Sequence, residues 1–172
     1  MGTGKEAKLS KRAGIDLTLR YLVDEGGCDA TRYFLVARAP NSQLTFDIDL
    51  ALSQSHDNPV YYIQYAYARA CSVMRKLKEQ GWEWQAERAL QNLDKLQEEH
   101  EKTLLRRLDR YPEVVVSAAL NSEPHTVAAY LRELAGDFHT WYNAHKMLVD
   151  DQGLRDARIA FSQAVGQVIA NG

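Results

Sequence analysis

The stretch NPVYYIQYAYAR, residues 58–69, carries the strongest sign of the fold that this sequence predicts. Asn58 is a residue type favoured at the N-cap of a helix, and Pro59 has the fixed backbone angle that a first helical turn accepts. We expect this helix to continue to Leu77 and to end near Gly81. Four of its residues are tyrosines, although leucine and isoleucine would fill a core without a hydroxyl group that needs a partner.

The chain downstream of this helix has helical periodicity up to its last residues. Leucines recur at helical spacing from Trp84 to Arg110, with an expected interruption between Leu96 and Glu99. Three further helices are expected: a short one opened by Pro112, a long one that starts at residues 122–124, and a last one over 154–170. These patterns predict a mainly α protein in which residues 56–172 form a helical bundle.

The chain upstream of residue 55 is expected to be a separate, short α-rich segment, so that the domains are 1–55 and 56–172. Residues 1–16 read as a loop, Thr18 as the N-cap of a helix through Val23, and residues 29–38 as a second helix. Residues 44–50 alternate apolar and polar side chains, which fits either a short strand or an extended segment that leads into a helical turn.

Composition excludes some classes of protein and leaves others open. The 172 residues are 45% hydrophobic and 26% charged, and they contain neither a membrane-spanning stretch nor the apolar core of a signal peptide. The two distant cysteines, Cys28 and Cys71, suit a reduced cytosolic protein. The net charge of −2 does not decide for or against nucleic acid, because clustered cations bind phosphate locally even on a slightly acidic chain.

The loop AKLSKRAG, residues 7–14, has the composition of a phosphate clamp. The ammonium groups of Lys8 and Lys11 would neutralise phosphate charge, Ser10 lies between them, and Gly14 would let the backbone approach. Such a motif alone is also compatible with a solvated basic segment.

The same loop resembles the K-M-S-K-S signature of class I aminoacyl-tRNA synthetases, in the K-M-S-K-R form typical of arginyl-tRNA synthetase. Residues 8–12 occupy its five positions, with Leu9 in place of methionine. The resemblance continues through residues 18–73 to LRDARIAFSQAVGQVIANG, residues 154–172, which is similar to the end of a DALR-type anticodon-binding domain. It implies a C-terminal fragment, shortened at its own C-terminus, that starts with the signature loop and ends in the anticodon-binding bundle.

The resemblance implies a role for the tyrosine-rich helix. Tyr62, Tyr65 and Arg69 share one face of a helix, which would offer rings to unstacked bases and a guanidinium group to a base edge or phosphate. Packing is the expected role of Tyr61 and Tyr67, and Gln64 suits a structural role as well as a binding one.

A second aromatic group, in GDFHTWYNAHK at residues 136–146, falls where the family lines its anticodon pocket. We expect Tyr142 and Trp141 to be partly exposed to RNA and Phe138 to be buried. The five histidines show no spacing for a metal site, and Asp47 and Asp49 are expected to cap the helix that follows.

The resemblance also implies partners and cofactors. The full-length enzyme would join L-arginine to its tRNA with ATP and Mg²⁺, and Lys8, Ser10 and Lys11 would hold the ATP phosphates. The 172 residues alone are expected to bind no cofactor and to be catalytically inactive, because the H-I-G-H signature is absent from them. A cytoplasmic monomer that binds arginine tRNA without contact to a membrane is expected. Two alternatives stay open: a helical protein–protein interaction module, and a free-standing tRNA-binding paralogue.

Overall fold

The computed structural model describes residues 18–43 and 45–172. In this part of the chain the regular secondary structure is helical, and no strand occurs. This confirms the predicted mainly α class. The elements are α1 (Leu19–Gly26), α2 (Cys28–Val36), α3 (Ile48–Leu52), α4 (Pro59–Glu79), α5 (Ala86–Leu90), the 3₁₀ turn η1 (Leu93–Lys95), α6 (Glu99–Asp109), α7 (Tyr111–Asn121), α8 (His125–Ala144) and α9 (Gln152–Asn171). None of these helices is both long enough and apolar enough to cross a membrane.

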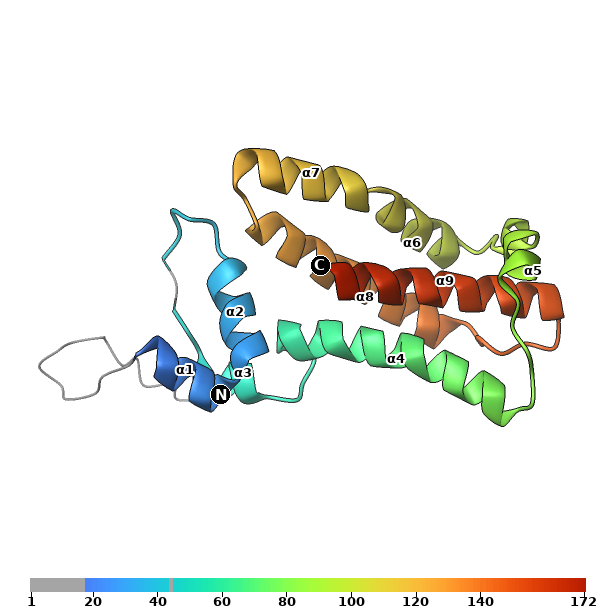
Figure 1. Cartoon of the computed structure of the whole chain (residues 1–172), viewed down its shortest axis with the longest axis horizontal. Helices are drawn as coiled ribbons and strands as arrows, with labels where there is room; N and C mark the ends of the chain where they lie inside the picture. The colour runs from blue at the N-terminus through green and yellow to red at the C-terminus, as the bar shows by residue number, and fades with distance from the viewer. Residues whose placement is uncertain (1–17, 44) are drawn as a thin grey trace, which may run out of the picture.

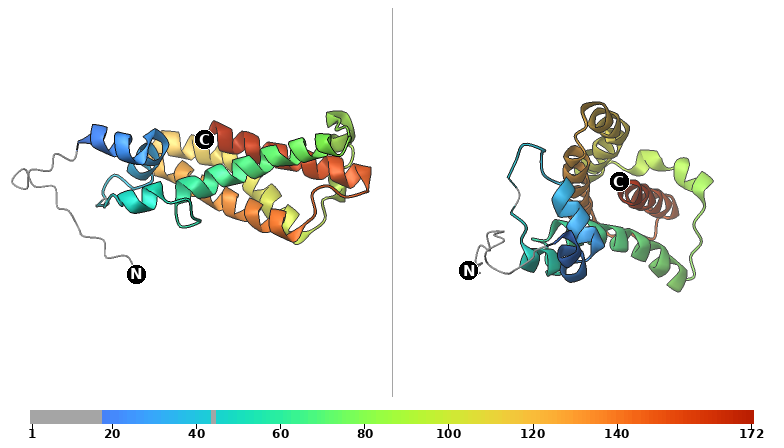
Figure 2. Two further views of the ribbon diagram at one scale, coloured as in Figure 1. Left: turned by 90° about the horizontal axis from the view of Figure 1, so that it is seen from below. Right: turned by 60° about the vertical axis from the view of Figure 1, so that its left-hand side comes forward.

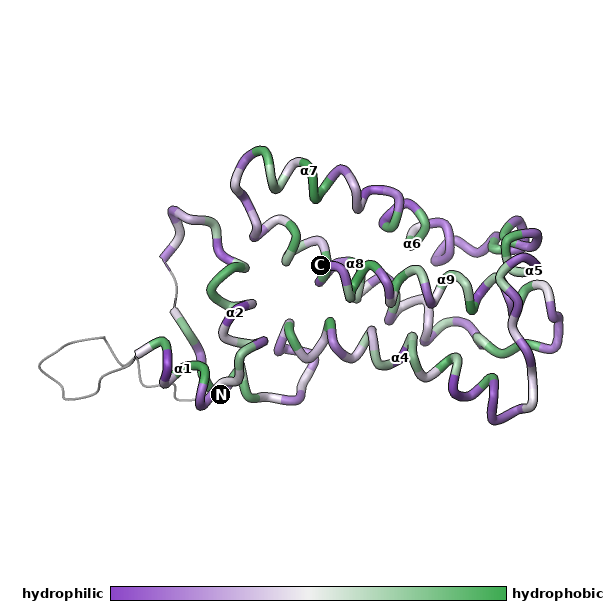
Figure 3. Tube along the Cα trace, in the orientation of Figure 1, coloured by the Kyte–Doolittle hydropathy of each residue, from purple (hydrophilic) through white to green (hydrophobic). Residues whose placement is uncertain are grey.

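The bundle is built around three long helices that run side by side. Helix α4 packs against both α8 and α9, while α6 and α7 cover α8, and α5 covers α9 (Figures 1 and 2). Hydrophobic residues recur along α7 and α8 between hydrophilic ones (Figure 3). The largest fully buried side chains of the core include Trp141, Phe138, Leu77 and Leu134.

The segment before the bundle folds into three short helices that pack on one another, and α2 contacts both α4 and α8 (Figure 1). Gly27 separates α1 from α2 and has a φ of 79°, a conformation that favours glycine. A small apolar cluster of Ala30, Ala51 and Val60 joins α2 and α3 to α4. The segment is therefore attached to the bundle through this cluster and through Tyr33 of α2, which also packs against the main core.

The structure shifts one expected range in this segment and decides between two alternatives that the sequence leaves open. The second helix spans Cys28–Val36, so it begins one residue before and ends two residues before the predicted range. Residues 45–47 form no strand; Asp47 is extended and its carboxylate accepts a hydrogen bond from the Leu50 amide at 2.9 Å. The extended segment leading into a helical turn, with Asp47 as its cap, is thus the correct one of the two alternatives. The five residues of α3 form a helix because they pack onto α1 and α2, and no strand lies among the described residues to pair with them.

Candidate nucleic-acid interface

Helix α4 begins where the sequence predicts, because the side chain of Asn58 makes four hydrogen bonds. Its side-chain oxygen accepts from the amides of Val60 and Tyr61 at 3.0 and 3.4 Å. Its amide nitrogen donates to the carbonyls of Ala51 and Ser53 at 3.0 and 2.8 Å. Asn58 thereby fixes both the first turn of α4 and the loop that leads into it, and it is only 4% exposed.

One face of α4 packs into the core, and the other faces carry the tyrosines and Arg69. The buried face consists of residues spaced three and four apart, namely Val60, Ile63, Ala66, Ala70, Val73 and Leu77. The small alanines face α9 closely: a Cβ added to Gly166 of α9 would lie 3.4 Å from the Cβ of Ala70. The tyrosines and Arg69 are left on the remaining faces, where Tyr62, Tyr65 and Arg69 are each partly exposed.

Four planar side chains from α4 and α8 form a column. Tyr61 and Tyr65 are stacked with ring centroids 5.9 Å apart and an interplanar angle of 9°. The guanidinium carbon of Arg69 lies 4.6 Å from the ring centroid of Tyr65 and 4.8 Å from that of Tyr142. Arg69 is therefore held between two aromatic rings by cation–π attraction. We call Tyr61, Tyr65, Arg69 and Tyr142 the tyrosine–arginine column.

Hydrogen bonds fix the orientation of Arg69 within the column. Its Nη1 donates to Asn143 Oδ1 at 3.0 Å and to His139 Nδ1 at 3.1 Å. His139 Nε2 donates in turn to the Tyr62 carbonyl at 3.0 Å. Since a carbonyl only accepts, His139 carries its proton on Nε2, and Nδ1 is free to accept from Arg69. The geometry thus requires a neutral His139.

The surroundings of His139 favour this neutral form. Its ring is 5% exposed and lies 4.5 and 5.4 Å from the ring centroids of Tyr62 and Tyr65. Burial lowers the pKa of His139 below its ordinary value, the hydrogen bond to Tyr62 partly opposes this, and the charge of Arg69 lowers the pKa further.

One sequence-based expectation about this surface is wrong. Trp141, expected to be partly exposed to RNA, is 0% exposed. Its ring packs against Phe138 and Phe161, and its indole N–H donates to the buried carboxylate of Glu101 at 3.3 Å. A tryptophan with a buried partner for its N–H can lie fully inside a core, so Trp141 belongs to the core and not to the surface.

The other aromatic residues divide as follows. Phe138 is fully buried and Tyr142 is partly exposed, as predicted. Tyr67, expected to pack, is 44% exposed, although one edge of its ring lies near Gly166 of α9. Gln64 has a structural contact, in which its amide donates to Asp29 of α2 at 3.1 Å.

Sequence reasoning missed three contributors. Tyr61, assigned to packing, stacks on Tyr65, and its spacing of four residues from Tyr65 is the signal that would have shown it. His139 and Asn143 were not associated with Arg69, although they are also four residues apart and so share a face of α8. No feature of the sequence shows that this face meets Arg69. Residues Lys8, Ser10 and Lys11 lie outside the described residues.

The described residues form an all-helical bundle with a partly exposed group of aromatic and cationic side chains, the side-chain types on which unpaired bases and phosphates bind. A model of the DALR anticodon binding domain matches residues 63–172. Because this match covers more than half of the chain, the chain belongs to the DALR anticodon-binding domain family.

Similar proteins agree with this assignment. The arginine–tRNA ligases of Legionella pneumophila (strain Corby) and Thioalkalivibrio sulfidiphilus are 52% and 53% identical over 169 residues, which are 98% of this chain and 29% of each relative. The arginyl-tRNA synthetase structure of Thermus thermophilus has a TM-score of 0.70 and 28% identity, over 88% of this chain and 28% of that one. This chain therefore spans less than a third of the length of these relatives. The predicted family is confirmed, and the alternative of a protein–protein interaction module is not favoured.

Proposed function

We propose that this chain is the tRNA-binding part of an arginyl-tRNA synthetase and that the tyrosine–arginine column binds the anticodon region of arginine tRNA. The observation that carries this proposal is the position of Arg69, held between Tyr65 and Tyr142 in a partly exposed site. Family membership supports the same ligand. Tyr62, Tyr65, Arg69 and Tyr142 are the proposed RNA-binding residues, and Tyr61 joins them through its stacking on Tyr65.

The chemistry of the column suits an unpaired stretch of RNA. Stacking of a base on an aromatic ring contributes about 1–3 kcal/mol and tolerates any base. Arg69 adds direction, because only its Nη1 is used within the described part of the chain. The N–H groups on Nε and Nη2 remain as donors for a base edge or a phosphate oxygen.

The full-length protein would supply the chemistry. We infer that it joins L-arginine to the tRNA with ATP and Mg²⁺, and that Lys8, Ser10 and Lys11 stabilise the ATP phosphates by their charge and hydrogen bonds. We also propose that the two domains divide at residue 55 and that the protein is a cytoplasmic monomer. The 172 residues alone should give no ATP–pyrophosphate exchange above background, and exchange by the purified chain would contradict this assignment.

The test of RNA binding is the variant Arg69→Ala. This change removes the planar guanidinium group between Tyr65 and Tyr142, and with it the hydrogen-bond donors available to RNA. Affinity for an anticodon stem–loop of arginine tRNA, measured by fluorescence anisotropy, should fall about 10- to 100-fold, which corresponds to about 1.4–2.7 kcal/mol.

The matched control is Arg75→Ala on the same helix, whose side chain is 72% exposed and lies near Glu79. It removes the same charge but leaves the column intact, so its affinity should stay close to wild type. Equal losses in both variants would show that only net charge matters and would contradict the assignment of the column.

A salt titration separates RNA binding from protein–protein association. Each neutralised phosphate of a single strand contributes about −0.7 to the slope of log affinity against log salt concentration. A slope steeper than about −2 is expected, equivalent to three or more phosphates. Binding to the stem–loop that is insensitive to salt would argue against the proposal.

A further inference from the structure

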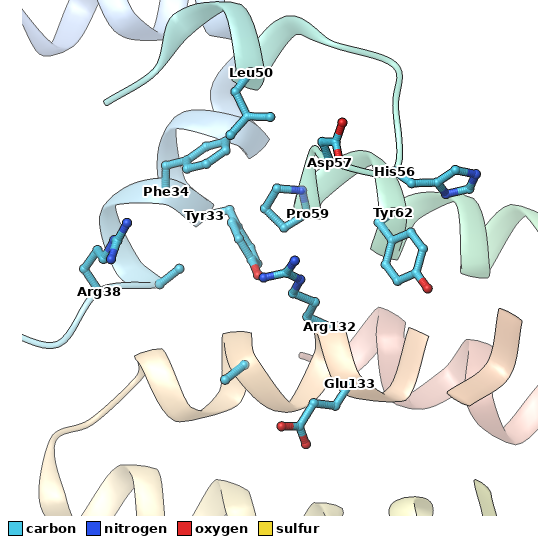
Figure 4. Close-up of a pocket in the computed structure, with 12 residues that line it drawn as sticks. Tyr33, Phe34, Arg38, Leu50, His56, Asp57, Pro59, Tyr62, Arg132 and Glu133 are labelled. Carbon is cyan, nitrogen blue, oxygen red and sulfur yellow. The ribbon is translucent and has the colours of Figure 1, made fainter. Parts of the chain in front are cut away.

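A cleft of about 880 Å³ lies where the N-terminal helices meet the bundle (Figure 4). Helix α2, the loop before α4, the start of α4 and the outer face of α8 supply its walls. Ligand sites in proteins typically have volumes of about 300–1,000 Å³. The residues that line it include Tyr33, His56, Tyr62, Ala129 and Arg132.

Aromatic rings form part of the cleft wall. Tyr33 of α2 is partly exposed, and its hydroxyl donates to the Ala128 carbonyl of α8 at 3.4 Å, which ties the two walls together. Tyr62 of α4 faces the cleft from the other side (Figure 4). A planar base would find ring surfaces on both α2 and α4.

The cleft also carries a cation, Arg132. Arg132 is exposed, and its guanidinium group extends toward the Tyr33 hydroxyl (Figure 4). Among the residues that the structure describes, Arg132 forms neither a hydrogen bond nor an ion pair. The carboxylate of the neighbouring Glu133 pairs instead with Arg107 of α6, which Asp137 also contacts. Burial raises the pKa of Tyr33, and the positive charge of Arg132 partly opposes this, as expected for two close groups.

The cleft adjoins the tyrosine–arginine column at His56 and Tyr62, which lie next to the column without belonging to it. His56 and Tyr62 line the cleft. The ring of His56 also lies 6.2 Å from that of Tyr65 and 6.3 Å from that of His139, measured between centroids. The cleft and the column therefore lie next to each other, within reach of one RNA strand.

We propose that the cleft is a second nucleotide site, which takes one unstacked nucleotide of the same RNA, with its base between Tyr33 and Tyr62 and its phosphate on Arg132. This inference rests on the proposed RNA-binding function and extends the contact surface from the bundle onto the N-terminal helices. Phosphate and ring contacts of this kind tolerate any base, so the site adds affinity more than sequence selection.

The experiment uses the full 172-residue chain and the anticodon stem–loop of arginine tRNA. Arg132→Ala should weaken binding about tenfold and reduce the salt slope by about 0.7 to 0.9. Arg106→Ala, which removes an exposed arginine from α6, is the control for net charge and should do neither.

A second pair of variants tests the cleft without removing a cation. Ala129 is exposed in the cleft wall on α8, so a longer side chain there should not disturb the core. Ala129→Glu places a carboxylate beside the phosphate and should weaken binding clearly more than its neutral counterpart Ala129→Gln. Thermal unfolding of each variant checks that the fold is retained.

The outcomes separate the two proposals. If Arg69→Ala loses affinity while Arg132→Ala and Ala129→Glu bind like their controls, the cleft proposal is overturned and the column stands. If Arg69→Ala also binds like wild type, the proposed function itself fails. A titration with AMP alone addresses a free nucleotide: submillimolar binding that Arg132→Ala abolishes, without any change in RNA affinity, would overturn the assignment to RNA.

Discussion

The residue that organises the candidate interface is His139, although it is almost completely buried. It accepts from Arg69 and donates to the carbonyl of Tyr62, so it joins the guanidinium group to the backbone of α4. A doubly protonated imidazole would point an N–H at the guanidinium group and could not accept. The orientation of Arg69 therefore depends on the protonation state of a residue that RNA does not need to touch.

A pH titration of stability tests this role. Since the pKa of His139 is lowered in the folded state, the unfolded chain takes up a proton first as pH falls. The free energy of unfolding should be constant above the ordinary value of 6.5 and should decrease below it, toward the lowered pKa.

The variant His139→Gln should remove this part of the pH dependence, because an amide can both donate and accept without titrating between pH 5 and 8. Urea unfolding at several pH values measures it. The control His100→Gln, at an exposed position of α6, should retain the wild-type pH dependence. A variant His139→Gln with an unchanged pH profile would show that His139 is not the responsible group.

At the scale of single elements, the N-cap residue of α4 makes more side-chain hydrogen bonds than the N-cap residues of α1 and α3. Asn58 satisfies two amides of the helix and two carbonyls of the preceding loop. Because the first turn of α4 carries Tyr61 and Tyr62, this cap also sets where the aromatic residues begin. The caps at Thr18 and Asp47, in contrast, serve short exposed helices.

We expect Asn58→Ala to lower the free energy of unfolding by about 2–4 kcal/mol. Loss of the cap costs about 1–2 kcal/mol, and unsatisfied buried carbonyls add a further 1–2 kcal/mol, roughly. Urea denaturation measures the change. The matched variant Asp47→Ala removes an exposed cap and should cost about 0.5–1 kcal/mol; an equal effect of the two would mean that the loop contacts of Asn58 contribute nothing.

Sequence patterns predicted the elements better than the contacts between them. The caps at Thr18, Asp47 and Asn58 and the break before α6 were readable because each depends on neighbouring residues. The burial of Trp141 was not, since it depends on Glu101, which lies 40 residues away. Only part of the surroundings of Arg69 could be predicted. The helical spacing places Tyr65 beside it on α4, but Tyr142 and His139 belong to α8, and their contact with Arg69 depends on how the two helices pack.

At the scale of the whole molecule, a buried carboxylate joins three helices. Glu101 of α6 accepts from Trp141 of α8 and from Arg158 of α9, the latter at 3.0 Å. Its second oxygen accepts from the Glu98 amide, which closes a capping box at the start of α6. Arg158 also donates to the Lys146 carbonyl at 2.9 Å. Both charges of the pair are thus enclosed and hydrogen-bonded.

Removal of one member should destabilise the bundle strongly. Glu101→Gln leaves the buried guanidinium group of Arg158 without its countercharge, which costs about 3–5 kcal/mol in comparable sites. The double variant Glu101→Gln with Arg158→Met should recover part of this loss, because no unpaired charge is left. Urea unfolding measures both.

The exposed pair of Lys102 and Glu99 on the same helix is the control, and Lys102→Ala should leave stability nearly unchanged. If Glu101→Gln is as stable as Lys102→Ala, the buried pair does not hold the three helices together.

The tyrosine–arginine column draws Tyr61, Tyr65 and Arg69 from α4 and Tyr142 from α8, so it is absent whenever these helices separate. An unfolded chain keeps all four side chains but has no assembled receptor for RNA. Occupancy by RNA must then protect the bundle, by about 2.7 kcal/mol at a ligand concentration 100 times the dissociation constant. A melting temperature that rises with added stem–loop would consequently show the binding of RNA through the stability of the protein, independently of the affinity measurement.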